Sequence, residues 1–391
     1  MTKIHSSNTA SGLVICSGNT RFYTQSGFTL IELMISLALG LVIAAAATML
    51  FLTGQKSYVL QTGMSDLQDN ANFGLNYIAK DIRLTNLNVA KADINDETNY
   101  GGVVLTSSVN ATKTPAMPAL GATPAIPAVP LSNLYKTIIG TSAAVNVLSR
   151  SNGMTGWTGV SNVNLSAGGN LSSDQLTLQY TPQYVLDDKG TPATGDDEWI
   201  GGFDCEGREL KFPVVNPGAN KPFGRQMVVQ RYFLRADTNM GNEPNQPLAL
   251  ACEAGFYALS DTGVVRVEGG APSQVLGTAT FGSGTGQIIM KRVDHFRVLL
   301  GVQNAASYRY MSIKDYMDMA AGSRPRILSI QLGTLVRSGQ SVSRDAVIAD
   351  DQNFQVLDQL IRVKTPANNA SKYVRQVVSQ TIALRNTFGD R

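Results

Sequence analysis

Charged residues, histidine and cysteine are all scarce in this chain of 391 residues. Charged residues make up 16% of it, and 32 basic side chains nearly balance 29 acidic ones. No Lys/Arg-rich run occurs, so we expect no nucleic-acid partner. The sequence also lacks a G-x-x-x-x-G-K-[ST] phosphate loop, which excludes a nucleotide-driven motor, and a G-x-S-x-G nucleophile motif.

Few residues are suited to catalysis or metal binding. His295 is the only histidine after residue 27, and it lies in an alternating, strand-like stretch beside Asp294. A Ser–His–Asp arrangement needs more than that pair. The segment 237–243 loosely resembles a calcium loop but lacks the full EF-hand pattern, and the acidic triplet 196–198 is typical of a solvated loop. We therefore predict no enzyme activity, no cofactor and no metal site.

The longest uncharged segment is the most informative feature of the chain. No charged residue occurs from Leu33 to Gln55, and about 20 apolar residues are enough for a helix to cross a bilayer. One glutamate, Glu32, stands at its start. An ionisable group beside a membrane segment is costly and usually has a partner. A local role is also open, because Thr29-x-x-Glu32 is a capping box for the start of a helix.

An ordinary secretory signal peptide, cleaved near Ala44–Ala47, is an alternative interpretation of this region. However, the apolar run is longer than the 7–15 residues usual for a signal peptide. The preceding region is also long, and its only Lys or Arg residues are Lys3 and Arg21. We therefore favour a retained membrane helix.

After the apolar run, hydrophobic residues continue at steps of three and four, which predicts an amphipathic helix with one buried face. These positions are Leu60, Met64, Leu67, Ala71, Leu75, Ile78 and Ile82. We predict a transmembrane helix over residues 28–52 and its amphipathic continuation over 53–85. Glycines at 40, 54, 63 and 74 weaken the helix, by about 1 kcal/mol each relative to alanine.

Residues 86–391 have the pattern of strands and turns. Alternating or β-branched runs occur at 176–180, 227–234, 296–300, 328–332 and 373–384, separated by clusters of Gly, Asn, Asp and Pro. A Pro-rich insert at 112–131 cannot continue a helix or donate to a sheet, so we expect an extended, solvated excursion. The predicted fold class is α+β, with the long N-terminal helix packed on an antiparallel, β-rich globular head.

The run from Gly27 to Met34, Gly-Phe-Thr-Leu-Ile-Glu-Leu-Met, resembles the class III signal of type IV pilins and pseudopilins. The resemblance implies that a prepilin peptidase cuts after Gly27 and that the new N-terminal residue, Phe28, is N-methylated. It also implies that Glu32 supports assembly by reaching the amine of a neighbouring subunit. Residues 1–27 are then a cleaved leader, and its removal changes the formal net charge from +3 to +1, with 30 basic against 29 acidic side chains.

The leader also changes the cysteine count. Cys16 leaves with it, whereas Cys205 and Cys252 remain in the exported head. Because disulfides persist in oxidising compartments, we predict a Cys205–Cys252 bridge. Because it closes a loop of about 48 residues, this bridge should add on the order of 3–4 kcal/mol to the free energy of unfolding. Two buried free thiols are the alternative, and a metal site is disfavoured because neither cysteine has a second Cys or His at ligand spacing.

The head resembles one branch of this family, the large minor pilins of the PilW type. The similar segments, in order, are Ser173-Asp174-Gln-Leu-Thr-Leu178, Asp204-Cys205-Glu-Gly207, Leu250-Ala-Cys252, Arg292 to Val298 and Ile382 to Asn386. The resemblance implies a structural subunit with a single pass through the bacterial inner membrane and a periplasmic head.

Such a subunit helps to prime type IV pilus assembly and then sits at the pilus tip. Its implied partners are the prepilin peptidase, other minor pilins, the major pilin, inner-membrane lipid and, in some systems, a large tip adhesin. Two other functions remain open. One is a minor pseudopilin of a type II secretion system, which uses the same leader and helix. The other is a membrane-anchored periplasmic binding protein.

Overall fold

The computed structural model describes most of the chain after the predicted leader. The described residues are 27–89, 91–98, 100–108, 133–135, 146–192, 195–214, 226–239, 245–259, 265–266, 281–282, 284–304, 307–341, 351–365 and 372–387. Residues 1–26 of the predicted leader, Cys16 and the Pro-rich insert at 112–131 lie outside the described residues. The chain divides into two compact units, Met1–Gln55 and Lys56–Arg391.

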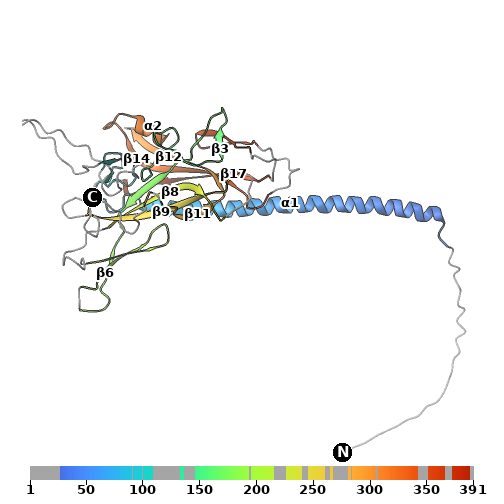
Figure 1. The fold of residues 1–391 in the computed structure, drawn as a ribbon, viewed down its shortest axis with the longest axis horizontal. Helices are drawn as coiled ribbons and strands as arrows, with labels where there is room; N and C mark the ends of the chain where they lie inside the picture. Colours follow the sequence, from blue (N-terminus) through green and yellow to red (C-terminus); the bar gives the residue numbers. More distant parts are fainter. Residues whose placement is uncertain are drawn as a thin grey trace, which may run out of the picture. The chain divides into compact units, whose positions relative to one another are not determined.

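One long helix and many strands make up the described secondary structure (Figure 1). The helices are α1 (Leu30–Leu84) and α2 (Ile313–Asp318), and a 3₁₀ turn, η2, covers Arg385–Thr387. The strands are β1 (Ser107–Ser108), β2 (Leu134–Tyr135), β3 (Val163–Leu165), β4 (Leu176–Tyr180), β5 (Val185–Asp187), β6 (Glu198–Phe203), β7 (Glu209–Pro213), β8 (Gln226–Ala236), β9 (Leu248–Leu259), β10 (Val265–Arg266), β11 (Gln287–Lys291), β12 (Val293–Asn304), β13 (Ser307–Ser312), β14 (Arg326–Arg337), β15 (Asn353–Val356), β16 (Gln359–Val363) and β17 (Arg375–Ala383).

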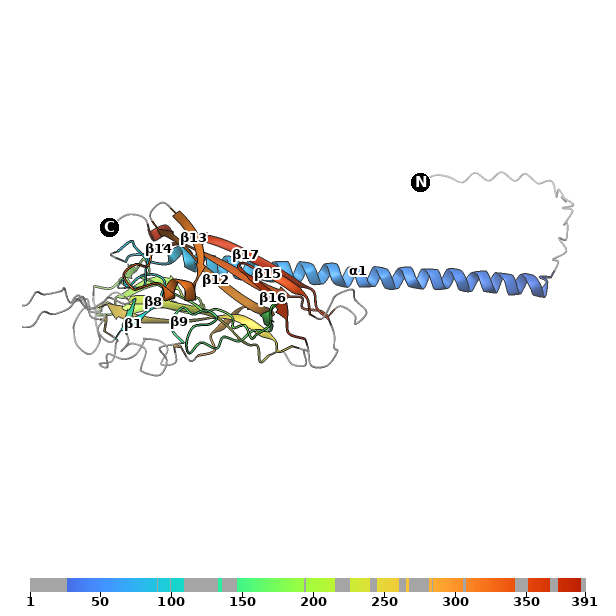
Figure 2. The ribbon, with the colours of Figure 1, turned by 90° about the horizontal axis from the view of Figure 1, so that it is seen from above.

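Two antiparallel sheets form the body of the second unit. One has the strand order β10-β9-β8-β4, with β11 also pairing with β9, and the other has the order β13-β12-β14-β17. Figure 2 shows the strands of the second sheet side by side. Two smaller antiparallel sheets have the orders β15-β16-β3 and β5-β6-β7, and β1 and β2 form a short parallel pair. The predicted α+β fold, a long helix on an antiparallel β-rich head, is confirmed.

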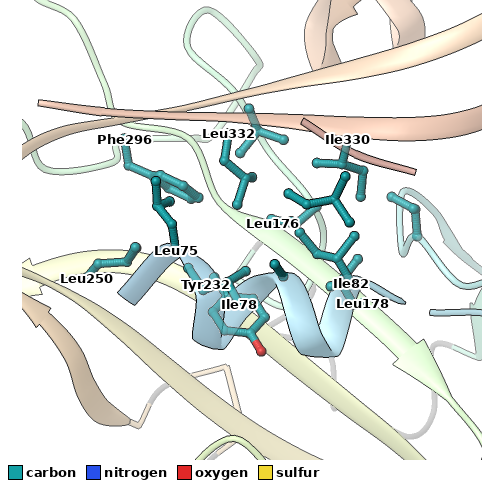
Figure 3. Close-up of a cluster of buried hydrophobic side chains, with 14 of the residues drawn as sticks. Leu75, Ile78, Ile82, Leu176, Leu178, Tyr232, Leu250, Phe296, Ile330 and Leu332 are labelled. Carbon is teal, nitrogen blue, oxygen red and sulfur yellow. The ribbon is translucent and has the colours of Figure 1, made fainter. Parts of the chain in front are cut away.

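The main core joins the C-terminal part of α1 to both large sheets (Figure 3). Leu75, Ile78 and Ile82 of α1 are almost completely buried there. They share one apolar cluster with Tyr232 and Leu250 of the first sheet and with Phe296, Ile330 and Leu332 of the second. The amphipathic stripe therefore holds the helix to the head by apolar burial, which is the main favourable term in folding.

The buried face of α1 differs from the predicted stripe at its beginning. Leu60 and Met64 are exposed, and the buried positions begin at Gly63 and Leu67. Glycine also has a packing role that periodicity did not indicate. A Cβ atom on Gly74 would lie 2.5 Å from Cε and 2.9 Å from Cβ of Met290 on β11. The absent side chain therefore lets the helix approach the strand closely.

Two strands that read as alternating are buried along all or most of their length. Every residue of β4 is buried, as are the first nine of β8. On β8, Tyr232 and Leu234 join the main core, whereas Met227 and Val229 join a second cluster with Val104. Both faces of this sheet are therefore covered within the head.

Candidate functional site

The start of α1 is closed by a reciprocal set of hydrogen bonds between Thr29 and Glu32. The Glu32 backbone N–H donates to Thr29 Oγ1 at 3.3 Å, while the Thr29 N–H and hydroxyl donate to Glu32 Oε2 at 3.0 and 2.9 Å. This is the capping box that the sequence predicted. These contacts to the carboxylate all use Oε2, so the cap does not occupy Oε1.

Gly27 and Phe28 precede this cap in backbone that belongs to neither a helix nor a strand, because α1 begins only at Leu30. The Phe28 side chain is 87% exposed, and no atom lies within 4 Å of a Cβ built on Gly27. A peptide bond in unfolded, uncovered chain is one that a peptidase can reach. The predicted cut between Gly27 and Phe28 therefore falls at an accessible position, immediately before the cap.

The apolar residues after Glu32 are uncovered in the first unit. Every residue from Leu33 to Leu52 is exposed, and α1 is the only helix in the described part of the chain that is long and apolar enough to cross a membrane. Its few polar side chains are satisfied by the helix itself. Ser36, Thr48 and Thr53 donate to the carbonyls of residues 33, 44 and 49 at 3.0, 2.8 and 2.9 Å. This surface therefore fits a lipid environment, where unsatisfied polar groups are costly.

A disulfide joins Cys205 to Cys252, as the cysteine count predicted, with their Cα atoms 6.1 Å apart. Both residues are buried in the main core. The bond ties the turn between β6 and β7 to β9. Tyr77 of α1 extends the connection, because its hydroxyl donates to the Cys205 carbonyl at 3.0 Å. Three segments far apart in the sequence thus meet at this bridge.

A buried carboxyl beside the disulfide was not predicted. Asp81 of α1 is only 5% exposed, and its Oδ2 accepts a 2.5 Å hydrogen bond from the hydroxyl of Tyr232. Tyr232 is in turn the cross-strand partner of Cys252. Burial raises the pKa of Asp81 to about 6, with a smaller opposing effect from the Tyr232 hydrogen bond. No local pattern marks Asp81, since the partner lies 151 positions away.

His295 is a buried residue held by neutral polar partners. Its Nδ1 lies 3.2 Å from the hydroxyls of both Ser161 and Ser173, and its Nε2 lies 3.1 Å from Gln359 Oε1. Because the Gln359 oxygen can only accept, Nε2 carries the proton and Nδ1 accepts. Burial lowers the pKa of His295 to about 4. The imidazole is thus neutral and fully engaged within the protein.

The acidic residues considered in the sequence also have structural partners. Asp294 bonds to Arg375 at 2.7 Å and to Asn162 at 2.9 Å, so its carboxylate is not directed to His295. Glu198 begins β6 and pairs with Lys189 at 2.6 Å, which differs from the predicted loop. Asp237 accepts from the Asn239 N–H at 3.1 Å. Among the described residues no group of three His, Cys, Asp or Glu side chains is placed to hold a metal ion.

Comparison with known protein families finds one match near each end of the chain. Residues 23–48 match the family described as prokaryotic N-terminal methylation motif, and residues 264–386 match the family described as Type IV Pilus-assembly protein W. No curated protein matches the chain.

Among solved structures, a type IV-like pilin from Thermus thermophilus is similar at 11% identity and a TM-score of 0.22, covering 59% of this chain and 85% of that one. The two family matches fall on the Gly27–Glu32 segment and on the C-terminal sheet of the head. The chain therefore carries a prokaryotic N-terminal methylation motif and, over residues 264–386, a segment that matches the Type IV Pilus-assembly protein W family.

Proposed function

We propose that this protein is a non-enzymatic minor pilin that helps to prime type IV pilus assembly and then sits at the pilus tip. The observation that carries the proposal is the N-terminal segment, in which an accessible Gly27–Phe28 bond and a capped Glu32 precede a fully exposed apolar helix. The match of the head to the pilus-assembly family supports a pilus rather than a generic membrane anchor. Before assembly the protein is held in the inner membrane by this helix, with its head in the periplasm.

The arrangement at Glu32 supports an assembly step. After cleavage, Phe28 carries a free amine, and the Glu32 carboxylate keeps Oε1 outside the cap formed through Oε2. Glu32 can therefore stay in its own cap and also accept a hydrogen bond from the amine of a neighbouring pilin. An ion pair of this kind is much stronger in lipid than in water because the surrounding dielectric constant is low. The exposed apolar surface of residues 33–52 then packs against the helices of other pilins.

Processing is tested at the Gly27–Phe28 bond. Mass spectrometry of the protein purified from membranes should find N-methylated Phe28 as the first residue. Gly27→Ala should slow the cut less than Gly27→Val, since the site requires a small residue. A mature chain that begins near Ala47 or Thr48 would instead identify a secretory signal and contradict the proposal.

The role of Glu32 is tested by variants that remove either its charge or its capping partner. Glu32→Gln keeps a side chain that can cap the helix but removes the charge, whereas Thr29→Val removes the cap partner and keeps the charge. If Glu32 pairs with a neighbour, Glu32→Gln and Glu32→Ala should both be cleaved and stable yet absent from sheared fibres. Thr29→Val should then assemble. The opposite ranking, with Glu32→Gln normal and Thr29→Val defective, would reduce Glu32 to a helix cap.

A further inference from the structure

Part of one sheet face in the head carries two exposed tyrosines. In the sheet β13-β12-β14-β17, Phe296 and Leu300 point into the main core, so the alternate residues point to the outer face. Leu357, between β15 and β16, lies against Gly333 and covers this part of the face. Near β13 the face is uncovered, with Tyr308 and Tyr310 exposed by 69% and 48%.

Six residues make up this part of the face, which we call the tyrosine platform, and one of them, Gly301, is buried beneath the Tyr310 ring. They are Tyr308 and Tyr310 on β13, Gly301 and Gln303 on β12, and Ser329 and Gln331 on β14. The pairing register places them in rows, because Tyr310, Gly301 and Ser329 are successive cross-strand partners and Tyr308 is opposite Gln303. The two rings therefore lie next to a flat strip of small and polar side chains.

The tyrosine side chains are ordered by their neighbours despite being exposed. Arg326 donates to Gln303 Oε1 at 3.1 and 2.7 Å, and Gln303 Nε2 donates to the Tyr308 hydroxyl at 2.9 Å. The Tyr310 ring lies over Gly301, where a Cβ atom would be 2.8 Å from Tyr310 Cε1 and 2.0 Å from Ser329 Oγ. Any larger residue at 301 would displace the ring. Pre-ordered rings lose little conformational entropy when a ligand binds.

The chemistry of the platform selects one class of ligand. None of its six residues is charged, and Arg326, which bonds to Gln303, pairs with Asp93 with Nη1 and Oδ1 3.7 Å apart. A nearly neutral surface does not match the phosphate backbone of a nucleic acid, which requires a basic groove. Aromatic faces suit the apolar C–H faces of sugar rings, while the Gln331 amide can bond to sugar hydroxyls and the Ser329 hydroxyl, which donates to the Tyr310 hydroxyl at 3.5 Å, can still accept from one.

We propose that the tyrosine platform binds a neutral glycan, with Tyr308 and Tyr310 stacking on successive sugar rings. Along a strand, residues two apart are separated by about 7 Å, which allows each ring to contact a different part of an extended oligosaccharide. The binding face lies on the head, away from Gly27 and Glu32 in the sequence, so the inference is independent of the assembly role.

The test uses the full-length protein in lipid nanodiscs and chitohexaose, a neutral oligosaccharide, as the probe. Isothermal titration calorimetry should show saturable binding, and Tyr308→Ala/Tyr310→Ala should weaken it at least tenfold. Tyr308→Phe keeps the ring but loses the Gln303 contact, so a smaller decrease is expected. Phe203→Ala is the matched control, because Phe203 is an exposed aromatic residue of the β5-β6-β7 sheet, 64% accessible, and its loss should not change the affinity.

Circular dichroism and thermal unfolding of each variant establish that a loss of binding is not a loss of folding. Failure of both chitohexaose and cellohexaose to bind the wild-type protein at millimolar concentration would overturn the proposal. Equal losses in Phe203→Ala and in the double tyrosine variant would do so as well. Tyrosine-dependent binding of a single-stranded oligothymidine without sugar binding would assign the platform to nucleic acid instead.

Discussion

Replacement of Asp81 by asparagine should stabilise the head at neutral pH, even though Asp81 accepts a hydrogen bond from Tyr232. The carboxyl is buried in the main core, where loss of hydration disfavours its charged form. Lys80 partly compensates, but Asp204 adds a second negative charge nearby. Asparagine has nearly the same shape and can still accept from the Tyr232 hydroxyl, while it carries no charge.

The size and the direction of the effect follow from the pKa of Asp81. This pKa is raised from 3.8 to about 6, so the folded chain holds the proton more tightly than the unfolded chain does. Stability from this site is therefore fully present below about pH 4 and is lost as the pH rises through 6. At about 1.4 kcal/mol per pKa unit, the loss approaches ~3 kcal/mol at pH 7. Asp81→Asn should recover most of it.

The assay is urea unfolding of the full-length protein at pH 4.5 and pH 7.5, followed by the fluorescence of Trp157 and Trp199. Asp81→Asn should raise the free energy of unfolding by about 1–3 kcal/mol at pH 7.5 and by much less at pH 4.5. Asp69→Asn, an exposed carboxyl on the same helix, should change it by less than about 0.5 kcal/mol at either pH. Equal effects of Asp81→Asn at both pH values, or destabilisation at pH 7.5, would refute the reasoning.

Two further predictions concern the packing and the cross-link of the head. Gly74→Ala should lower the free energy of unfolding by about 1–3 kcal/mol, because its Cβ would overlap Met290. Gly63→Ala, whose Cβ would meet Ser338 Cβ at an ordinary 3.4 Å, should be neutral or slightly stabilising in the same urea titration, and equal losses would exclude the packing explanation. Cys205→Ser should cost on the order of 3–4 kcal/mol in the head, and non-reducing peptide mapping should find Cys205 joined to Cys252 in the wild-type protein. Alkylation of both thiols without reductant would contradict that bond.

The features that sequence reasoning found are those with a local or countable signal. The capping box depends on Thr29 and Glu32, three residues apart, and the apolar run needs no distant partner. The disulfide was predicted from the number of cysteines, because only Cys205 and Cys252 remain once Cys16 is assigned to the leader. The strand runs of the head were also recognisable, since β12 and β14 contain the segments expected at 296–300 and 328–332, and β17 covers most of the segment expected at 373–384.

The features that were missed depend on contacts between distant segments. Asp81 lies beside Ile78 and Ile82 at the edge of the apolar stripe and has no local partner, and its hydrogen-bond partner Tyr232 is 151 positions away in the sequence. Gly74 reads as a weak helix position, whereas Met290 makes it a packing requirement. Leu60 and Met64 continue the apolar stripe but precede the region in which the sheets cover the helix. The periodicity of the apolar residues predicts which face of a helix is buried. It does not predict at which residue the sheets begin to cover that face.

The close approach of α1 to β11 has a consequence for how this head can evolve. Position 74 has no room for a side chain as long as a methionine occupies position 290, and the Met290 side chain would clash with any Cβ placed there. A substitution at Gly74 therefore costs stability unless position 290 changes with it. Relatives that have alanine or serine at position 74 should carry alanine or glycine at position 290, and with alanine the strand must also shift slightly, because the Cβ of residue 290 itself lies 2.9 Å from the added Cβ. The two positions, 216 residues apart in sequence, should thus vary as a pair.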